Sequence, residues 1–358
     1  MKSDSQKSIK QLLLLLPFLS KIKYAMKKRT LLFVTFFLSL SVVAQTSKDK
    51  GLATINKESA EAYISFLASD ALQGREGGKN SRIAAEYIKS LLQDMGVKPL
   101  NNKDYFQPFE AYSRERQTKS RFSVHPDSIS KYKQERAYRR LEFNNVLGCI
   151  EGKNKSEYVV IGAHFDHLGM DESLIGDQIY NGADDNASGV SAVLQIAKAF
   201  QASGQQPERN IIFAFWDGEE LGLLGSEYFA ANCSFISSIR GYLNFDMIGR
   251  NKDEAQPKHV VYFYTESYPA FGEWLKSDIQ QYGLNLEPDY RPWDRPIGGS
   301  DNASFAKRDI PVIWYHTDGH PDYHQPSDHA DKINWDKLVD ITKASFLNMW
   351  NLANLSIF

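Results

Sequence analysis

Cysteine is nearly absent from this 358-residue sequence, which contains only Cys149 and Cys233. Two cysteines form at most one disulfide, so the fold does not depend on a disulfide framework. After export they could form one disulfide or remain two buried free thiols, and the sequence leaves both states open. Neither lies in a context typical of a nucleophile, and the Gly-x-Ser-x-Gly motif of many serine hydrolases is missing. These absences disfavour a serine or cysteine hydrolase.

Long apolar runs are also missing. The apolar run Leu31–Val43 is too short for a comfortable membrane span. It follows a basic start at Met26 and ends in Val-Val-Ala, a pattern that predicts a secretory signal peptide over 26–44, cleaved after Ala44. The residue directly after the cleavage point is Gln45 rather than a cysteine that could carry a lipid, so we expect no stable membrane anchor. We expect translation to start at Met26 and the mature protein to be exported, to the periplasm or the extracellular space.

Positive charge is in deficit once this leader (residues 1–44) is removed. The leader holds eight Lys or Arg and one Asp, so its loss changes the formal net charge from −2 to about −9. No basic patch suited to nucleic acid remains, and we expect no nucleic-acid partner. The His-Glu-x-x-His zinc helix is absent as well.

The remaining sequence has an α/β pattern. Short apolar runs of strand length alternate with stretches whose apolar residues recur at helical spacing. This alternation predicts one α/β domain over 51–358, with a mixed, mostly parallel sheet covered by helices on both faces. The segment at about 110–140 is charged and has little periodicity, so we expect an irregular excursion or a pair of exposed strands there.

Metal-competent side chains follow the ends of several predicted strands. In α/β sheets, ligands bind beyond the carboxyl ends of the strands, so side chains at these positions are expected to converge. A further acidic pair, Asp184 and Asp185, precedes a predicted helix. The candidate residues at the strand ends are His164, Asp166, His167, Asp217, Glu219, Glu220, Asp246, His316, His320, His324 and His329.

Taken singly, each of these positions has an ordinary explanation. Asp184 and Asp185 could cap the following helix, and Asp246 could be a hydrogen-bonded core residue. Together they form an acidic cluster whose burial without a cation costs several kcal/mol for each uncompensated charge. Carboxylates and imidazoles without thiolates suit zinc, manganese or cobalt. Three acids and two histidines fit two zinc ions, roughly 3.5–4 Å apart, that share a bridging carboxylate.

Seven motifs, in this order, resemble the co-catalytic di-zinc aminopeptidases, metallopeptidase family twenty-eight. That family includes leucyl aminopeptidases, glutamate carboxypeptidases and, as a cyclising branch, glutaminyl cyclases. The resemblance implies the zinc-dependent exopeptidase fold, peptide substrates and two zinc ions. The motifs are LASDALQGREGGKNSRIAAEYIKSLLQDMG, NVLGCIEG, VVIGAHFDHLG, NGADDNASGVSAVLQIAKAF, FWDGEELGLLGSEYF, LNFDMIG and DYHQPSDHADKI.

Carried over by position, the resemblance implies a ligand set. His164 and Asp246 would bind one zinc ion, and Glu220 and His324 would bind the other. Asp184 would bridge the two ions, through a cis peptide bond to Asp185.

The resemblance also implies three catalytic roles. Glu219 would be the general base that takes a proton from the attacking water and passes it to the departing amine. Asp166 would accept a hydrogen bond from the far nitrogen of His164 and fix its tautomer. Tyr323 would hydrogen-bond the developing oxyanion.

Two features depart from the family's pattern. Asn302 stands where a histidine is common, which bears on the substrate pocket. His316 follows its strand in a context that mimics a ligand, but we prefer His324, because Asp328 four residues later is a plausible partner for it. We read His167, His320 and His329 as surface residues or as partners of the ligands.

The sequence thus predicts a secreted zinc exopeptidase that removes N-terminal residues from peptides. A glutaminyl cyclase-like zinc aminoacyltransferase is the alternative within the family, and a non-catalytic binding module on the same fold is the alternative outside it. Side-chain preference and oligomeric state stay open, although Tyr290, Trp293 and Trp314 could line an apolar pocket.

Overall fold

The computed structural model describes residues 45–101, 103–114, 121–295 and 298–356. The chain divides into two units, Met1–Thr46 and Ser47–Phe358. The predicted signal peptide at 26–44 lies outside the described residues. Ser47–Phe358 contains every element discussed below.

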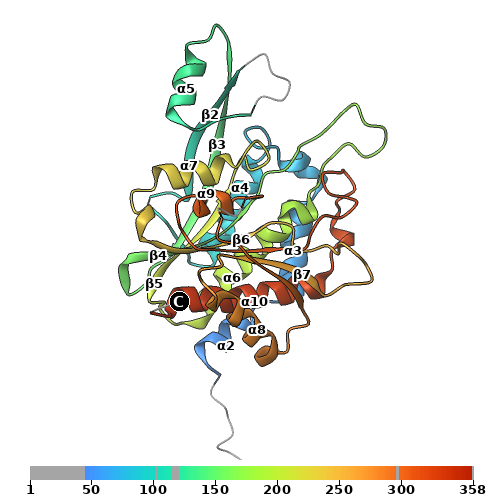
Figure 1. Cartoon of the computed structure of the whole chain (residues 1–358). Coiled ribbons are helices and arrows are strands. Elements are labelled where there is room, and N and C mark those ends of the chain that lie inside the picture. Colours follow the sequence, from blue (N-terminus) through green and yellow to red (C-terminus); the bar gives the residue numbers. More distant parts are fainter. Residues whose placement is uncertain (1–44, 102, 115–120, 296–297, 357–358) are drawn as a thin grey trace, which may run out of the picture. The chain divides into compact units, whose positions relative to one another are not determined.

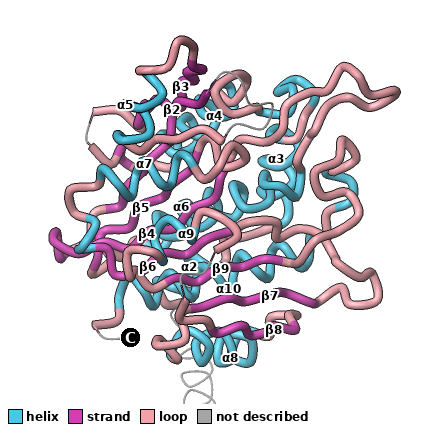
Figure 2. Tube along the Cα trace, turned by 45° about the horizontal axis from the view of Figure 1, so that its top comes forward, coloured by secondary structure: helices cyan, strands magenta, loops and turns pink. Residues whose placement is uncertain are grey.

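One mixed sheet runs through Ser47–Phe358, and Figure 2 shows its strands side by side. Among the described residues it contains nine strands in the order β1-β3-β5-β4-β6-β9-β7-β8, with β2 paired to β3. The strands are β1 (Lys98–Pro99), β2 (Phe106–Arg114), β3 (Tyr138–Ile150), β4 (Asn154–His164), β5 (Arg209–Trp216), β6 (Ile239–Phe245), β7 (His259–Tyr264), β8 (Glu287–Pro292) and β9 (Val312–His316).

Parallel pairing is concentrated at the centre of this sheet. Strands β5, β4, β6 and β9 are parallel neighbours, and β8 runs parallel to β7. The pairs of β3 with β1, β2 and β5, and of β7 with β9, are antiparallel. The predicted mixed α/β fold is confirmed, although parallel pairs are no more numerous than antiparallel ones. Strand β5 is buried along its whole length, as expected for a parallel strand covered on both faces.

Helices cover both faces of the sheet (Figure 1). Alternate residues of a strand point to opposite faces, and β4 follows this rule: Val159 and Ile161 join one core cluster, whereas Val160 joins another. The first cluster includes residues of α3 (Lys57–Leu67), α4 (Arg82–Asp94), α6 (Gly189–Ser203), α8 (Ala270–Tyr282) and α10 (Trp335–Asn354). The second includes Phe229 of α7 (Leu224–Asn232) and Phe305 of α9 (Asn302–Ala306). A short helix, α2 (Ser47–Leu52), packs on α6.

The predicted excursion at about 110–140 is more regular than expected. It contains the end of β2, the helix α5 (Pro126–Lys133) and the start of β3, while 115–120 lies outside the described residues. Strands β2 and β3 pair from Phe106–Val146 to Arg114–Tyr138, so the pair of exposed strands is the alternative that the structure supports. A small core beneath it contains Phe109, Ala111, Phe122, Val124, Phe143 and Leu224.

The central strands create an edge suited to a ligand. From β4 the chain passes through α6 to β5 on one side, and from β5 it passes through α7 to β6 on the other side of β4. A crevice forms where parallel strands diverge in this way, beyond their carboxyl ends.

Two further observations concern the cysteines and the helices of the described residues. Cys149 and Cys233 are free thiols, and Cys149 is buried in β3. Among the described residues, no helix combines the length and the apolar character needed to cross a bilayer.

Candidate metal centre

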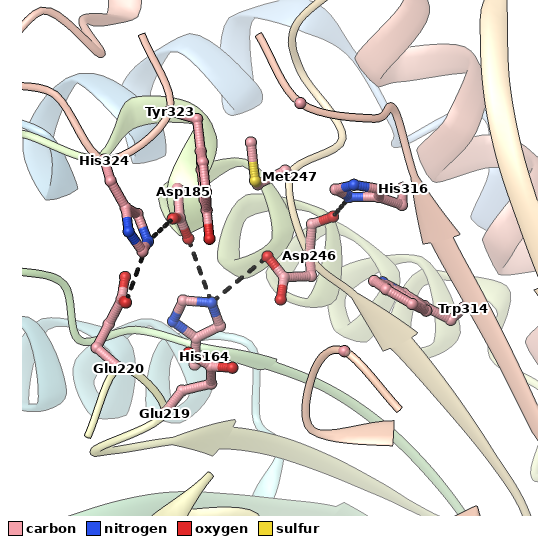
Figure 3. Close-up of a pocket in the computed structure, with 12 residues that line it drawn as sticks. His164, Asp185, Glu219, Glu220, Asp246, Met247, Trp314, His316, Tyr323 and His324 are labelled. Atoms are coloured by element: carbon pink, nitrogen blue, oxygen red, sulfur yellow. Dashed lines mark hydrogen bonds and ion pairs between the residues drawn. The ribbon is translucent and has the colours of Figure 1, made fainter. Parts of the chain in front are cut away.

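Four strand ends deliver acids and imidazoles to one place (Figure 3). His164 is the last residue of β4, and Asp246 directly follows β6. Glu219 and Glu220 lie in the turn after β5, and His324 comes from the loop after β9. These residues line one cavity of about 250 Å³, together with Asp185. The expected convergence of strand ends is therefore present.

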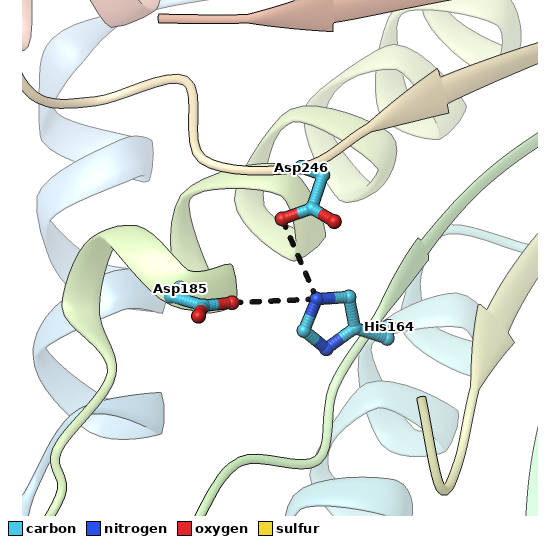
Figure 4. Close-up of side chains that lie close together, drawn as sticks. All are labelled: His164, Asp185 and Asp246. Atoms are coloured by element: carbon cyan, nitrogen blue, oxygen red, sulfur yellow. Dashed lines mark ion pairs between the residues drawn. The ribbon is translucent and has the colours of Figure 1, made fainter. Parts of the chain in front are cut away.

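Asp185 lies at the centre of the group. Its Oδ1 is 3.4 Å from Nε2 of His164, and its Oδ2 is 3.2 Å from Nε2 of His324. His164 Nε2 is also 3.6 Å from Oδ1 of Asp246, which completes the set drawn in Figure 4. His324 Nε2 is 3.2 Å from Oε2 of Glu220. The two oxygens of one carboxylate thus face two different imidazoles, each with a second acid beside it.

The spacing of these donor atoms fits metal coordination. Zinc binds nitrogen and oxygen ligands at about 2.0–2.2 Å, so neighbouring ligand atoms of a tetrahedral site lie roughly 3.3–3.6 Å apart. The four donor separations of 3.2–3.6 Å agree with this value. Among the described residues, three groups of side chains each have ligand atoms that all lie within 4.8 Å of one another. These groups are His164, Asp185 and Asp246; His164, Glu219 and Glu220; and His167, Asp185 and Glu220.

Asp184, the expected bridging residue, is not in this group. Its Oδ1 accepts a hydrogen bond of 2.6 Å from the backbone N–H of Gly249, and its Oδ2 lies 3.2 Å from Nε2 of His320. The cis peptide bond is also one residue later than expected, between Asp185 and Asn186. Asp185 has non-helical φ and ψ of −104° and 93°, so its side chain and that of Asp184 leave the backbone in different directions. Asp185, rather than Asp184, is therefore the acid that faces both His164 and His324.

Asp166 has a different partner from the one expected. His164 Nδ1 contacts the backbone carbonyl of Asp166 at 3.2 Å, while the Asp166 carboxylate is 3.9 Å away, too far for a hydrogen bond. The carbonyl thus takes the place of the carboxylate beside His164. The carboxylate instead accepts hydrogen bonds from the backbone N–H groups of Glu219 and Glu220, at 3.0 and 3.4 Å. Asp166 therefore holds the turn that carries both glutamates.

Asp328, expected as a partner of His324, supports the backbone of Asp184 and Asp185 instead. Its Oδ2 accepts hydrogen bonds from the backbone N–H groups of Asp184 and Asp185, at 3.0 and 3.1 Å. This buried carboxylate fixes the backbone at the turn from which Asp185 projects.

The charges of the group favour the binding of a cation. Burial raises the pKa of Glu219 well above its usual range, and nearby carboxylates, including Asp246, add to this shift. The charge of Asp301, which directly precedes α9, also raises the pKa of Glu219, and burial raises the pKa of Asp301 itself to about 7. For His324, burial lowers the pKa, but contacts with Asp185 and Glu220 outweigh it and raise the pKa to about 10. A divalent cation bound among these acids would offset their mutual repulsion.

Aromatic and apolar residues form the rest of the cavity. Tyr323 points into it, and its ring stacks on that of His324 with centroids 3.9 Å apart (Figure 3). Trp314 and Met247 also line it. The sequence suggested Tyr290, Trp293 and Trp314 for an apolar pocket, and of these Trp314 lines the cavity. His316 lines the cavity as well, and its Nδ1 contacts the backbone carbonyl of Asp246 at 2.6 Å.

The remaining histidines differ in burial. His329 is exposed and contacts Asp177 at 2.9 Å. His167 and His320, read from the sequence as surface residues or partners of the ligands, are both buried. His320 contacts Asp184 beneath the cavity, and His167 contacts Glu220. Sequence reasoning missed the place of Asp185 and this contact of His167. The repeated Asp184-Asp185 was the available signal for the first, but it does not say which acid faces the cavity.

Comparison with curated proteins gives partial matches to peptidases. The chain is 32% identical over 170 residues to leupeptin-inactivating enzyme 1 of Streptomyces exfoliatus, covering 47% of this chain and 34% of that protein. It is 31% identical over 176 residues to probable leucine aminopeptidase 2 of Aspergillus oryzae, covering 47% and 32%. It is 30% identical over 211 residues to probable glutamate carboxypeptidase LAMP1 of Arabidopsis thaliana, covering 52% and 28%. The chain thus spans about a third of the length of these relatives.

Solved structures with the same fold include both hydrolases and cyclases. The LapA aminopeptidase of Legionella pneumophila superimposes with a TM-score of 0.62 at 23% identity, covering 85% of this chain and 74% of that chain. For BSAP, a zinc aminopeptidase of Bacillus subtilis, the TM-score is 0.64 at 15% identity, with 84% and 96% covered. For the glutaminyl cyclase of Fimbriiglobus ruber, it is 0.60 at 16% identity, with 83% and 95% covered. These similarities establish the fold without choosing between the two reactions.

The match to a family model covers residues 145–348, more than half of the chain. It extends from the end of β3 to α10 and so includes all the strand ends that form the metal centre. The chain belongs to peptidase family M28.

Proposed function

We propose that this protein is an exported, zinc-dependent aminopeptidase that holds two ions. The observation that supports the proposal most is the orientation of the Asp185 carboxylate, which directs one oxygen at His164 and the other at His324. His164, Asp246 and one oxygen of Asp185 would hold the first ion. Glu220, His324 and the other oxygen of Asp185 would hold the second.

The two ions, when bound, would supply Lewis-acid activation of water and of the scissile carbonyl. Glu219 is suited to accept the proton of the attacking water, because its carboxylate lies beside His164 without taking part in the pair formed by Glu220 and His324. The same carboxylate would return the proton to the departing amine. Asp166 accepts hydrogen bonds from the backbone N–H groups of both glutamates and so fixes the turn from which their side chains project to different partners. Tyr323, which points into the cavity, would donate a hydrogen bond from its hydroxyl group to the oxyanion and keep its proton.

The charge of the cavity favours action at the amino end of a peptide. Among the described residues that line it, acids and imidazoles predominate, and neither lysine nor arginine is present. A free α-ammonium group is attracted by such a site, whereas a terminal carboxylate would need a cationic partner. A cavity of about 250 Å³ is of a size for one terminal residue rather than for an internal stretch of peptide.

Export is proposed from the sequence alone. The segment 26–44 has the basic start, apolar centre and small-residue end of a secretory signal.

The experiment that tests the proposal combines metal analysis with substrate assays. Purified protein should contain two zinc ions per chain, hydrolyse leucyl anilide and lose this activity with a chelator. If the protein instead binds one zinc ion and cyclises glutaminyl peptides, it is a glutaminyl cyclase-like aminoacyltransferase and the proposal is wrong. Tight peptide binding without turnover in the zinc-loaded protein would support the binding module.

Glu219→Gln tests the general base. It should lower kcat by about 10²–10⁴-fold, because the amide cannot accept the proton. The metal content should stay at two ions, since Glu219 lies outside the proposed ligand set. Glu287→Gln, which removes an exposed carboxylate in β8, is the matched control and should leave kcat unchanged. Retention of wild-type kcat by Glu219→Gln would remove Glu219 from the role of base.

A further inference from the structure

His167 makes a contact that the proposed mechanism does not use. Its side chain is completely buried, and its Nδ1 lies 2.7 Å from Oε1 of Glu220. The other ring nitrogen, Nε2, is buried and has no hydrogen-bond partner among the described residues. A buried imidazole in direct contact with a proposed metal ligand is either a ligand itself or a group that orients the ligand.

Neighbouring residues hold both the backbone and the ring of His167. Its backbone N–H donates to the carbonyl of Arg75 at 3.1 Å. A Cβ placed on Gly182 would lie 2.6 Å from Cδ2 of the ring, so the ring packs directly against the backbone there. Gly182 has a φ of +58°, a conformation that glycine adopts without strain. Gly182 precedes Asp185 by three residues, so the ring is held by the loop that carries the bridging carboxylate.

Distances distinguish the two roles. The four donor pairs assigned to metal binding are separated by 3.2–3.6 Å, close to the roughly 3.3–3.6 Å between ligand atoms around one zinc ion. The 2.7 Å between His167 Nδ1 and Glu220 Oε1 is shorter than any of them and is typical of a charge-assisted hydrogen bond. His167 Nδ1 is 3.8 Å from Asp185 Oδ2, beyond hydrogen-bond distance.

We infer that His167 is a positioning residue for Glu220 rather than a metal ligand. Its Nδ1–H donates to Oε1 and holds that oxygen, which leaves Oε2 directed at His324, 3.2 Å away. Glu220 would therefore bind its ion through one oxygen. This inference rests on the proposed two-ion centre, because it assigns the orientation of one of that centre's ligands.

The test compares two replacements of His167 in the full-length mature protein. The side-chain nitrogen of asparagine occupies nearly the same place as Nδ1 of histidine, so His167→Asn keeps a donor for Glu220. His167→Leu has a similar size but no donor. Metal-free protein is titrated with zinc against a competing chelator, and the visible absorption spectrum is recorded after loading with cobalt. Because the readouts are affinity, stoichiometry and a spectrum, the test does not depend on activity.

If His167 positions Glu220, His167→Leu should lower the affinity for one of the two zinc ions by about 10–100-fold. This is the usual effect of losing a partner of a metal ligand. His167→Asn should bind both ions within about threefold of the wild type, and its cobalt spectrum should be unchanged, because no ligand has been removed. His329→Asn and His329→Leu are matched controls at an exposed histidine, and both should bind two ions normally. If His167→Leu fails to fold, His167→Gln takes its place, since its amide lies farther along the side chain.

Three results would overturn the inference. If His167→Asn and His167→Leu both lose one ion to the same extent, and the cobalt spectrum of His167→Asn is changed, His167 is a metal ligand. Wild-type binding by His167→Leu would mean that Glu220 needs no such partner. Failure of the wild-type protein to bind two ions would sink the proposed function first, and the inference with it.

Discussion

The replacement of Asp185 by asparagine is the most direct test of the metal centre. The amide keeps one oxygen where the carboxylate has two, so an oxygen can face His164 or His324 but not both, and the negative charge is lost. Loss of an outer partner of a metal ligand commonly costs 10–100-fold in affinity. Loss of the shared ligand itself should cost more than this for at least one ion, which corresponds to at least about 2.8 kcal/mol. Asp185→Asn should therefore retain fewer than two ions at micromolar free zinc.

Asp184→Asn is the matched control, because it makes the same chemical change one residue earlier. The amide oxygen can still accept the hydrogen bond that Gly249 donates to Oδ1. The amide nitrogen can donate to His320, which now lies beside Oδ2. The cost in the free energy of unfolding should stay within about 1 kcal/mol, and both ions should bind as in the wild type.

The assay is calorimetric titration of both metal-free variants with zinc, followed by hydrolysis of leucyl anilide. Thermal unfolding confirms that each variant is folded. Loss of an ion in Asp184→Asn together with two normal ions in Asp185→Asn would refute the geometric argument and restore Asp184 as the bridge.

Three further predictions concern stability, specificity and processing. Burial raises the pKa of Asp278 in α8 to about 6, so its carboxyl favours folding below about pH 4 and loses this contribution as the pH rises through 6. Asp278→Asn, measured by urea unfolding, should be more stable than the wild type by about 1–2 kcal/mol at pH 8 and by little at pH 4, and an equal gain at both pH values would contradict this cause. Trp314→Leu should widen the cavity and shift the ratio of kcat/KM towards phenylalanyl over alanyl anilide by roughly tenfold, whereas an unchanged ratio would remove Trp314 from the side-chain pocket. N-terminal sequencing of the exported protein should begin at Gln45, and any other first residue would move the cleavage site.

The convergence of these side chains on one cavity could be predicted from the sequence because the strands are strongly apolar and end abruptly in acids and histidines. Strand β5 is a run of buried residues followed at once by the turn that holds Glu219 and Glu220. Which of two adjacent acids enters the centre could not be predicted. That choice depends on the backbone angles at Asp185 and on the hydrogen bonds from Asp328, a residue more than 140 positions later.

The edges of the sheet were predicted less well than its centre. Strand β8 has the sequence Glu-Pro-Asp-Tyr-Arg-Pro, with no buried residue and no apolar alternation, and among the described residues it pairs only with β7. Proline is tolerated at an edge because one side of the strand needs no backbone partner, so the sequence carries no signal of burial there. Strand β2 and helix α5 pack on a small separate core, which the charged residues of 110–140 obscure in the sequence.

The different roles of Glu219 and Glu220 also follow from contacts distant in sequence. Two neighbouring carboxylates repel each other, and nothing in their local sequence assigns one to a metal and the other to a proton. The turn after β5 begins at Gly218, whose φ of +79° favours glycine and redirects the chain away from the strand. Asp166, at the end of β4, then accepts the N–H groups of both glutamates and holds this turn against the neighbouring strand. With the backbone fixed there, the contacts with His167 and His324 involve Glu220 alone, and Glu219 remains beside His164 without them.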